Sequence, residues 1–144
     1  MSRIRESFDR FYCNLSMFEL QMINKGVDGK VSYGDALYLD IIHFNPGCTV
    51  SRLAEILNVS KPAVTVKVNS LMEQGYLVKT KSEEDARVNY LTTAPGTEDL
   101  YRQEAAELEK IIAELRQRFP QEDLDKFCEI LDFASSLMGS DTKD

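Results

Sequence analysis

Residues 49–92 read TVSRLAEILNVSKPAVTVKVNSLMEQGYLVKTKSEEDARVNYLT. The first half of this stretch carries two short apolar stripes at helical spacing, and the second half carries two segments rich in β-branched and aromatic residues. The pattern predicts a helix, a tight turn, a second helix and a two-stranded β-hairpin. The expected fold class is therefore mainly α (α+β), a winged helix-turn-helix with further helices on either side.

Local start and stop signals delimit the two expected helices. Thr49 can accept a hydrogen bond as the N-cap of the first helix, and Ser60 can do the same for the second. Asn58 lies between them, where a tight turn requires a left-handed backbone conformation that asparagine tolerates. Pro62 falls in the first turn, where a missing N–H costs nothing, and Gly75 lies at the expected C-terminal cap.

The second helix has an inward and an outward face. The inward stripe consists of Val64, Val68, Leu71 and Met72. A rotation of about 100° per residue then leaves an outward face formed by Pro62, Ala63, Val66, Asn69 and Ser70, flanked by Thr65 and Lys67. In a helix-turn-helix protein this face enters the DNA major groove, where an exposed valine can contact a thymine methyl and asparagine or serine can bond base edges. Lys61 and Lys67 can bond phosphates, and Ser60 and Thr65 are further candidates for DNA contact. The alternative is an ordinary solvated face with one exposed valine.

The expected hairpin has a charged tip. Its strands are Tyr76–Val78 and Val88–Thr92, and the polar run between them contains Lys81, Asp85 and Arg87. Residues two apart point the same way from an extended strand, so Asp85 can hold the Arg87 guanidinium through paired hydrogen bonds. An arginine held in this way suits a narrow minor groove, and Lys81 is a further candidate for DNA contact. The alternative is a surface ion pair worth roughly 0–1 kcal/mol.

These segments resemble the multiple-antibiotic-resistance regulator (MarR) family. Residues 53–65 resemble its helix-turn-helix, residues 71–77 resemble the exit from its recognition helix, and Asp85-Ala86-Arg87 matches its D-x-R wing motif. Thr93-Ala94-Pro95-Gly96 resembles the T-x-x-G that opens its next helix. The resemblance implies a homodimeric transcription factor, expected to be a repressor, that binds a pseudo-palindromic operator in double-stranded DNA and often releases it when a small molecule or oxidant is sensed. The stretch from Arg87 to Gly96 is about one residue shorter than the family pattern, which leaves the register of the second strand open.

The acidic residues are unevenly distributed. The net charge of −7 is unfavourable for a protein that binds nucleic acid. Residues 50–90 hold six basic and five acidic side chains, so the other positions hold eleven basic and nineteen acidic ones. An acidic body with a nearly neutral lobe is expected to bind DNA with a shallow salt dependence. The same acidity favours an alternative, a winged-helix protein-interaction module that does not read DNA.

The domain organisation is expected to be a single domain over residues 1–144. Its winged-helix lobe occupies residues 32–96, with helical dimerisation regions at 1–30 and 97–138. The apolar positions of residues 3–25 cover more than one helix face, which indicates burial on more than one side. We therefore expect a homodimer that spaces its two reading helices about one DNA turn apart. The alternative is that these helices complete a monomer core.

A small-molecule effector has no direct signature in the sequence. In the resembled family such ligands often bind between the dimerisation helices and the winged-helix lobe, and the residues that can line this region are Phe11, Tyr12, Tyr33, Tyr38 and His43. His43 is the only histidine, and a lone histidine near a helix end is more often structural. One branch of the family senses hydroperoxides with a cysteine in its first helix, where Cys13 lies. Its apolar neighbours predict burial, which disfavours a reactive thiol.

No catalytic residue, metal site or cofactor is predicted. The chain shows no pairing of nucleophile and base, no phosphate loop and no metal-ligand spacing, and its three cysteines, Cys13, Cys48 and Cys128, have no paired spacing. No apolar run approaches about 18 residues, and the N-terminus lacks the apolar core of a signal peptide. We therefore expect no membrane association and a cytoplasmic location.

Overall fold

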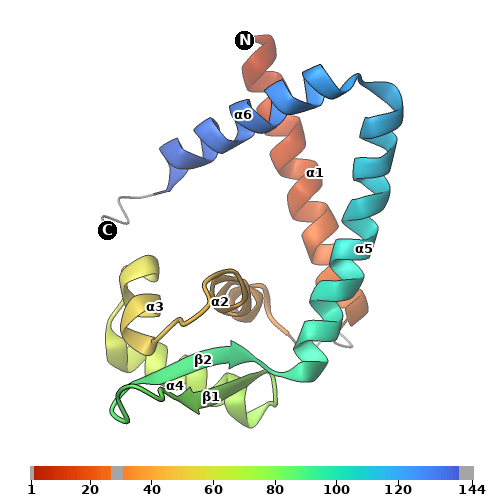
Figure 1. Cartoon of the computed structure of the whole chain (residues 1–144). Helices are drawn as coiled ribbons and strands as arrows, with labels where there is room; N and C mark the ends of the chain where they lie inside the picture. Colours follow the sequence, from red (N-terminus) through yellow and green to blue (C-terminus); the bar gives the residue numbers. More distant parts are fainter. Residues whose placement is uncertain (1, 27–30, 140–144) are drawn as a thin grey trace. The chain divides into compact units, whose positions relative to one another are not determined.

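The computed structural model describes residues 2–26 and 31–139. Within this part of the chain, the elements follow in the order α1 (Arg3–Gly26), α2 (Tyr33–Phe44), α3 (Val50–Leu57), α4 (Lys61–Glu73), β1 (Leu77–Lys81), β2 (Asn89–Thr93), α5 (Pro95–Arg118) and α6 (Gln121–Met138) (Figure 1). The predicted fold class, mainly helical with one small antiparallel hairpin, is confirmed. Residues 27–30, at the end of the expected N-terminal region, lie outside the described residues. The chain divides into two compact units, Met1–Leu100 and Tyr101–Asp144.

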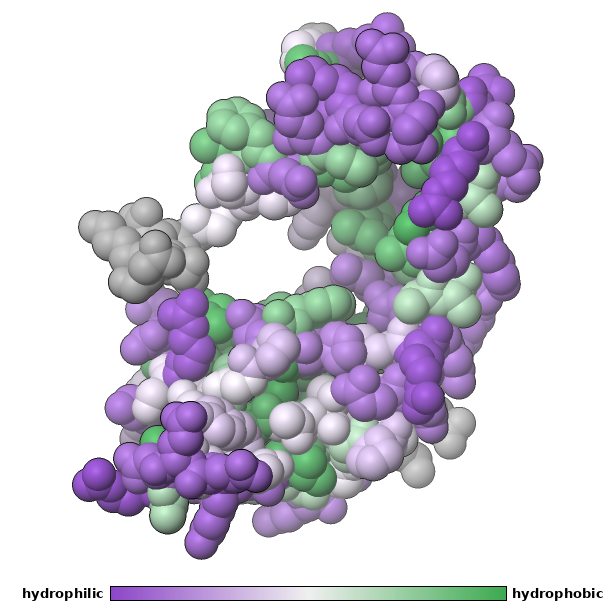
Figure 2. Space-filling view, in the orientation of Figure 1, coloured by the Kyte–Doolittle hydropathy of each residue, from purple (hydrophilic) through white to green (hydrophobic). Residues whose placement is uncertain are grey.

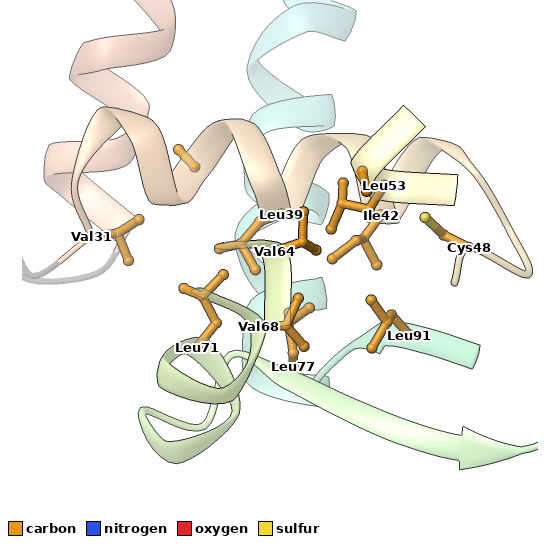
Figure 3. Packing of buried hydrophobic residues seen from close by; sticks show 12 residues of the cluster. Val31, Leu39, Ile42, Cys48, Leu53, Val64, Val68, Leu71, Leu77 and Leu91 are labelled. Atoms are coloured by element: carbon orange, nitrogen blue, oxygen red, sulfur yellow. The ribbon is translucent and has the colours of Figure 1, made fainter. Parts of the chain in front are cut away.

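The core of the first unit lies among α2, α3, α4 and the hairpin (Figure 3). Each of these elements turns one stripe inward, and Leu53, Val64, Val68 and Leu71 are each 0% exposed. Burying an aliphatic side chain of this size stabilises the fold by about 1.5–3 kcal/mol. Because α3 and α4 each bury one face in this core, the residues on their opposite faces remain on the outside.

Helix α2 forms one side of this core. Its N-cap is Ser32, whose hydroxyl accepts a hydrogen bond from the Asp35 backbone N–H at 3.1 Å. Ala36, Leu39 and Ile42 are buried at helical spacing, with Val31 beside them just before the helix.

Cys48, in the turn between α2 and α3, is part of the same core although no sequence pattern predicted it. The side chain is 1% exposed, and burial raises the pKa of its thiol, with a smaller opposing effect of the Arg52 charge. Its backbone oxygen accepts a hydrogen bond from the Leu91 N–H at 2.8 Å, which joins this turn to β2. The thiol therefore fills the core at the base of the wing, where it also donates a weak hydrogen bond to the Thr49 carbonyl oxygen.

The β-hairpin is longer than the expected strands. β1 runs to Lys81, three residues beyond the predicted end at Val78, because it continues to pair with β2. Leu77 pairs with Thr93 and Lys81 pairs with Asn89, which settles the register that the sequence left open. The predicted strand from Val88 to Thr92 is displaced by one residue, to Asn89–Thr93.

The second unit contains most of α5 and all of α6. Helix α5 begins at Pro95, two residues before the expected start, because proline is tolerated at the first helical position. Pro120 separates it from α6. Near this corner Leu115, Phe119, Asp123, Leu124 and Phe127 line an apolar cavity of about 400 Å³. No residue of α6 is buried in the single chain.

Candidate nucleic-acid interface

The turn between α3 and α4 has the geometry that its sequence predicted. Thr49 caps α3 by accepting the Arg52 N–H at 3.1 Å, and Ser60 caps α4 by accepting the Ala63 N–H at 3.3 Å. Between them Asn58 adopts the left-handed conformation, with φ 53° and ψ 47°. Pro62 lies in the first turn of α4, and Gly75 has a φ of +82° just beyond its end. These local features fix the direction in which α4 leaves the turn.

The outward face of α4 is formed by the residues that its periodicity indicated. Val64, Val68 and Leu71 are buried, whereas Pro62, Ala63, Val66, Asn69 and Ser70 are exposed. The Val66 side chain is 72% exposed on the side opposite this stripe. Thr65 and Lys67 are half-buried on the flanks, as expected, and Lys61 is exposed at the first residue of the helix.

Lys67 forms an ion pair that the sequence did not reveal. Its Nζ donates a hydrogen bond to Oδ1 of Asp35, at the start of α2, at 2.7 Å. Burial raises the pKa of the Asp35 carboxyl, but hydrogen bonds from Lys67 and Ser32 and the Lys67 charge outweigh it, so the pKa lies below its ordinary value. The hydrogen bond to Asp35 in turn raises the pKa of Lys67. The ammonium group predicted to bond phosphate is thus engaged within the protein, where it links α4 to α2.

Two other polar side chains of α4 also have partners in their own helix. The Thr65 hydroxyl donates a hydrogen bond to the Lys61 carbonyl oxygen at 2.9 Å. The Ser70 hydroxyl accepts one from Nε2 of Gln74 at 3.1 Å. By contrast, the Asn69 amide makes no hydrogen bond to the described part of the chain, so both its donor and its acceptor face outward.

The predicted pair of Asp85 and Arg87 forms, but by a different route. Both residues lie in the loop between β1 and β2 and not on an extended strand. Oδ1 of Asp85 accepts the Arg87 backbone N–H at 3.0 Å and the Arg87 Nε–H at 3.3 Å. One carboxylate oxygen therefore holds both the turn and the guanidinium, in place of the expected paired bonds. The Arg87 side chain remains 91% exposed.

The loop at the end of the wing is held by its own hydrogen bonds. The Ser82 hydroxyl accepts the backbone N–H groups of Glu84 and Asp85, at 3.2 and 3.3 Å. The Ser82 N–H donates to the Val88 carbonyl oxygen at 2.9 Å, closing the loop. The tip is hydrophilic surface in Figure 2. Lys81 is exposed at the end of β1, beside this loop.

A cavity of about 320 Å³ separates the wing from the start of α3. Its lining residues are Thr49, Val50, Ser51, Lys79, Arg87, Val88 and Asn89. Directly opposed residues of an antiparallel pair share one face, so the pairing of Lys79 with Leu91 points Lys79 toward the side of the sheet that covers the core. Two cationic side chains thereby border the N-terminal end of a helix, a combination that attracts anions. Sequence reasoning missed Lys79 because it placed this residue in the wing loop.

The five aromatic and imidazole residues predicted to line an effector site lie on two helices. Phe11 and Tyr12 are 54% and 71% exposed on α1, and Tyr33 is 58% exposed at the start of α2. Tyr38 and His43 are half-buried on α2.

His43 joins α2 to the start of α5. Its Nδ1 lies 3.1 Å from Oε1 of Glu98. Its ring packs edge-on against the Phe44 ring, with 4.8 Å between the ring centroids. The Thr93 hydroxyl donates a hydrogen bond to the same Glu98 oxygen. The histidine therefore has a structural role at this junction, whether or not it also touches an effector.

The prediction that Cys13 is buried was wrong. Cys13 and Cys128 are exposed in the single chain, and only Cys48 is buried. The apolar neighbours of Cys13 in the sequence do not cover it, because none of residues 3–25 of α1 is fully buried. Across residues 2–26 and 31–139 no group of three or more His, Cys, Asp or Glu side chains could hold a metal ion. Nor does any helix in these ranges combine the length and the hydropathy of a membrane span.

The geometry described above defines a winged helix-turn-helix protein, with two capped helices, a left-handed turn, an outward-facing second helix and a hairpin wing. Residues 30–88 match the family model described as MarR family. Through this lobe the chain is similar to the MarR family. It has the fold of that family's DNA-binding transcriptional regulators.

Solved structures extend the likeness to nearly the whole chain. FabT of Streptococcus pneumoniae, determined in complex with DNA, is 20% identical, with a TM-score of 0.73 over 94% of this chain and 95% of its own. A MarR-like transcriptional regulator of Thermotoga maritima is 16% identical, with a TM-score of 0.69 over 98% and 99% of the two chains. Staphylococcus aureus MarR in complex with salicylate and kanamycin is 20% identical, with a TM-score of 0.64 over 94% and 89%. Identities this low show a shared fold. No curated protein sequence matches the chain.

Proposed function

We propose that the chain is a sequence-specific DNA-binding regulator that acts as a homodimeric repressor on a pseudo-palindromic operator. The observation that carries this proposal is the outward face of α4. Val66 is 72% exposed and lies beside Asn69, whose amide has no partner among the described residues. The opposite side of this helix buries Val64, Val68 and Leu71. An apolar group next to a bidentate hydrogen-bonding group suits base edges in the major groove. FabT, which shares the fold, was determined in complex with DNA.

The wing supplies the second contact in this proposal. Arg87 is 91% exposed, and its bond to Asp85 limits the positions that the guanidinium can adopt. An arginine presented in this way fits a narrow minor groove. The cavity beside it suits a backbone phosphate, because Lys79 and Arg87 border it and the Val50 and Ser51 N–H groups have no acceptor among the described residues.

A second subunit would cover the apolar surface of the terminal helices. No residue of α6 is buried, yet Ile130, Phe133, Leu137 and Met138 are between 54% and 72% exposed. In Figure 2 the visible surface over this helix is partly hydrophilic and partly hydrophobic. An exposed apolar strip of this length favours association. In the proposed dimer these helices, together with α1, join two lobes so that each α4 reads one half-site. A dimer seated on an operator blocks other proteins from the same DNA, which makes repression the simplest outcome.

Release by a small molecule is part of the proposal. Staphylococcus aureus MarR, which has a similar fold, was determined with salicylate and kanamycin. The candidate contact residues here remain Phe11, Tyr12, Tyr33, Tyr38 and His43. Three of them are more than half exposed in the single chain, so a subunit interface or a ligand would have to cover them.

Fluorescence anisotropy tests the proposed function. The purified protein is titrated onto a labelled duplex from upstream of its own gene, onto a scrambled duplex and, in parallel, onto a duplex recovered by selection from a random pool. We expect at least one specific duplex to bind at least about 10³-fold more tightly than the scrambled one at physiological salt, with one dimer per site. Equal affinity for every duplex at every salt concentration would overturn the proposal.

The second candidate function is a winged-helix interaction module that binds protein and not DNA. The observation that favours it is the net charge of −7. It predicts equally weak binding to all duplexes, and it does not explain why Val66 and Asn69 are exposed side by side on α4. The same titration therefore separates the two candidates.

A further inference from the structure

The cationic side chains of α4 are placed in a way that limits which bases it can read. The helix contains two basic residues, Lys61 and Lys67, and no arginine. Guanine is read in the major groove chiefly by arginine or lysine, which bond its O6 and N7. The Lys67 ammonium bonds Asp35 at 2.7 Å, and Lys61 lies at the first residue of the helix. The middle of α4 therefore presents no cation for a guanine.

The same part of the helix presents apolar surface. Val66 is 72% exposed, and Pro62 and Ala63, one turn earlier, are exposed on the same face. In the major groove the C5-methyl of thymine is the apolar group that a side chain can contact. A valine here gains contact area on thymine and none of comparable kind on the other bases.

Asn69 adds a complementary hydrogen-bonding group. It follows Val66 by three residues, and such residues are neighbours on a helix surface. Its amide has no partner in the described part of the chain, so both groups are available to the N6 donor and N7 acceptor of adenine. Three residues span about 4.5 Å of helix axis, close to the spacing of about 3.4 Å between successive base pairs. The two side chains therefore suit neighbouring base pairs.

We infer that the base pairs facing the middle of α4 are A·T pairs, with Val66 on a thymine methyl and Asn69 on an adjacent adenine. This inference rests on the proposed function, and it names the class of half-site that the outward face recognises. Arg87 fits the same picture, since A-tracts have the narrow minor groove that attracts an inserted arginine. Lys61, at the first residue of the helix, can contact a base or a phosphate at a different position of the half-site.

Base analogues test the inference atom by atom. A specific duplex is first obtained by selection from a random pool. Each thymine of one half-site is then replaced in turn by uracil, which lacks the methyl, and each adenine by 7-deazaadenine, which lacks the N7 acceptor. Anisotropy gives the affinity of the wild type, Val66→Ala and Asn69→Ala. Arg118→Ala is the control, because Arg118 is exposed at the end of α5, outside the lobe that carries α4.

We expect uracil at one position of the half-site to weaken wild-type binding about fourfold, as expected for one methyl group. Val66→Ala should lose this sensitivity to uracil, and the Arg118→Ala control should keep it. 7-Deazaadenine at a neighbouring position should weaken wild-type binding by at least about fivefold, and Asn69→Ala should abolish that difference.

Two results would overturn the inference while leaving the proposed function intact. One is specific binding in which every thymine tolerates uracil. The other is a loss of affinity with 7-deazaguanine in the half-site that Val66→Ala or Asn69→Ala removes, since it would place a guanine under the middle of α4. If no selected duplex binds more tightly than the scrambled one, the proposed function fails and the inference fails with it.

Discussion

At the scale of single residues, Arg87 is expected to contribute to DNA binding and very little to the stability of the fold. Its side chain is 91% exposed, and its ion pair with Asp85 is a surface interaction worth at most about 1 kcal/mol. We expect Arg87→Ala to change the free energy of unfolding by less than about 0.5 kcal/mol. A lost minor-groove contact should weaken DNA binding about tenfold.

Urea denaturation and anisotropy measure the two effects of Arg87→Ala separately. Arg118→Ala is the matched control, because Arg118 is exposed at the end of α5, outside the lobe. It should leave both quantities nearly unchanged. Unaltered affinity in Arg87→Ala would remove the wing arginine from the proposed interface.

The bond between Lys67 and Asp35 predicts that Lys67 positions α4 and does not neutralise phosphate. Lys67→Met and Asp35→Asn should each lower the free energy of unfolding, and the double variant should lose less than the sum, as for a directly interacting pair. Lys67→Met should leave the salt dependence of DNA binding unchanged, whereas Lys61→Met should make the slope shallower by about 1 per subunit. A shallower slope in Lys67→Met, with tighter DNA binding in Asp35→Asn, would mean that DNA competes with Asp35 for the ammonium group.

The lowered pKa of Asp35 also makes a prediction for acid stability. A carboxyl whose folded-state pKa is depressed binds its proton less readily when folded, so it contributes stability above its unfolded value, near the ordinary 3.8. That contribution is lost as the pH falls below 3.8 through the depressed folded value. Between pH 5 and pH 2, a range set by about 1–2 units on either side of the ordinary carboxyl value, Asp35→Asn should lose less stability than the wild type. Parallel acid unfolding curves for the two proteins would contradict this expectation.

At the scale of elements, the sequence predicted most where the signal is local. The caps at Thr49 and Ser60, the left-handed turn at Asn58 and the end of α4 near Gly75 depend on residues within one helical turn of each other. The outward face of α4 followed from its own periodicity. A reader of the sequence could therefore place the candidate recognition surface without knowing what packs behind it.

Features that depend on distant partners could not be predicted in this way. β1 extends to Lys81 because Asn89 pairs with it, and the loss of an apolar pattern after Val78 gave no sign of that pairing. Lys67 and Asp35 are 32 residues apart, and no spacing rule connects them. The exposure of Cys13 depends on what covers α1, which its sequence neighbours do not determine.

Replacing glycine by alanine at two positions tests the assigned boundaries of α4 and α2. The substitution is expected to lower the stability of the protein at one position and to raise it at the other. Gly75 has a φ of +82°, and a Cβ there would meet no atom within 4 Å, so Gly75→Ala is opposed only by backbone strain. It should destabilise the protein by about 1 kcal/mol. Gly34 is the second residue of α2, and its Cβ would approach only the Ser32 hydroxyl, at an ordinary 3.9 Å. Gly34→Ala should therefore stabilise the protein by about 0.4–1 kcal/mol, because alanine restricts the unfolded chain. Urea midpoints check both, and a stabilising Gly75→Ala would contradict the assigned end of α4.

At the scale of the whole molecule, the terminal helices carry apolar area that the single chain leaves uncovered. Neither residues 3–25 of α1 nor any part of α6 contains a fully buried residue, although both regions are rich in large apolar side chains. By contrast, α3 buries Leu53 and Ala54, and α4 buries Val64, Val68 and Leu71. Because apolar burial is the main favourable term in folding, helices that lack it in the monomer are expected to obtain it from a partner.

A substitution at Phe133 tests whether a second copy of the chain covers α6. It is 67% exposed, so Phe133→Glu removes almost nothing from the single chain but places a charge in the proposed subunit interface. We expect sedimentation equilibrium to show a dimer for the wild type and mostly monomer for Phe133→Glu, with the urea transition of the winged-helix lobe retained. DNA affinity should fall by at least about 100-fold, because two half-sites would then be bound separately.

Phe44→Glu is the control, since Phe44 is 72% exposed at the end of α2, outside the expected dimerisation regions. A wild type that remains monomeric at micromolar concentration, or a Phe133→Glu variant that remains dimeric, would remove this face of α6 from the assembly and require another explanation for its uncovered apolar residues.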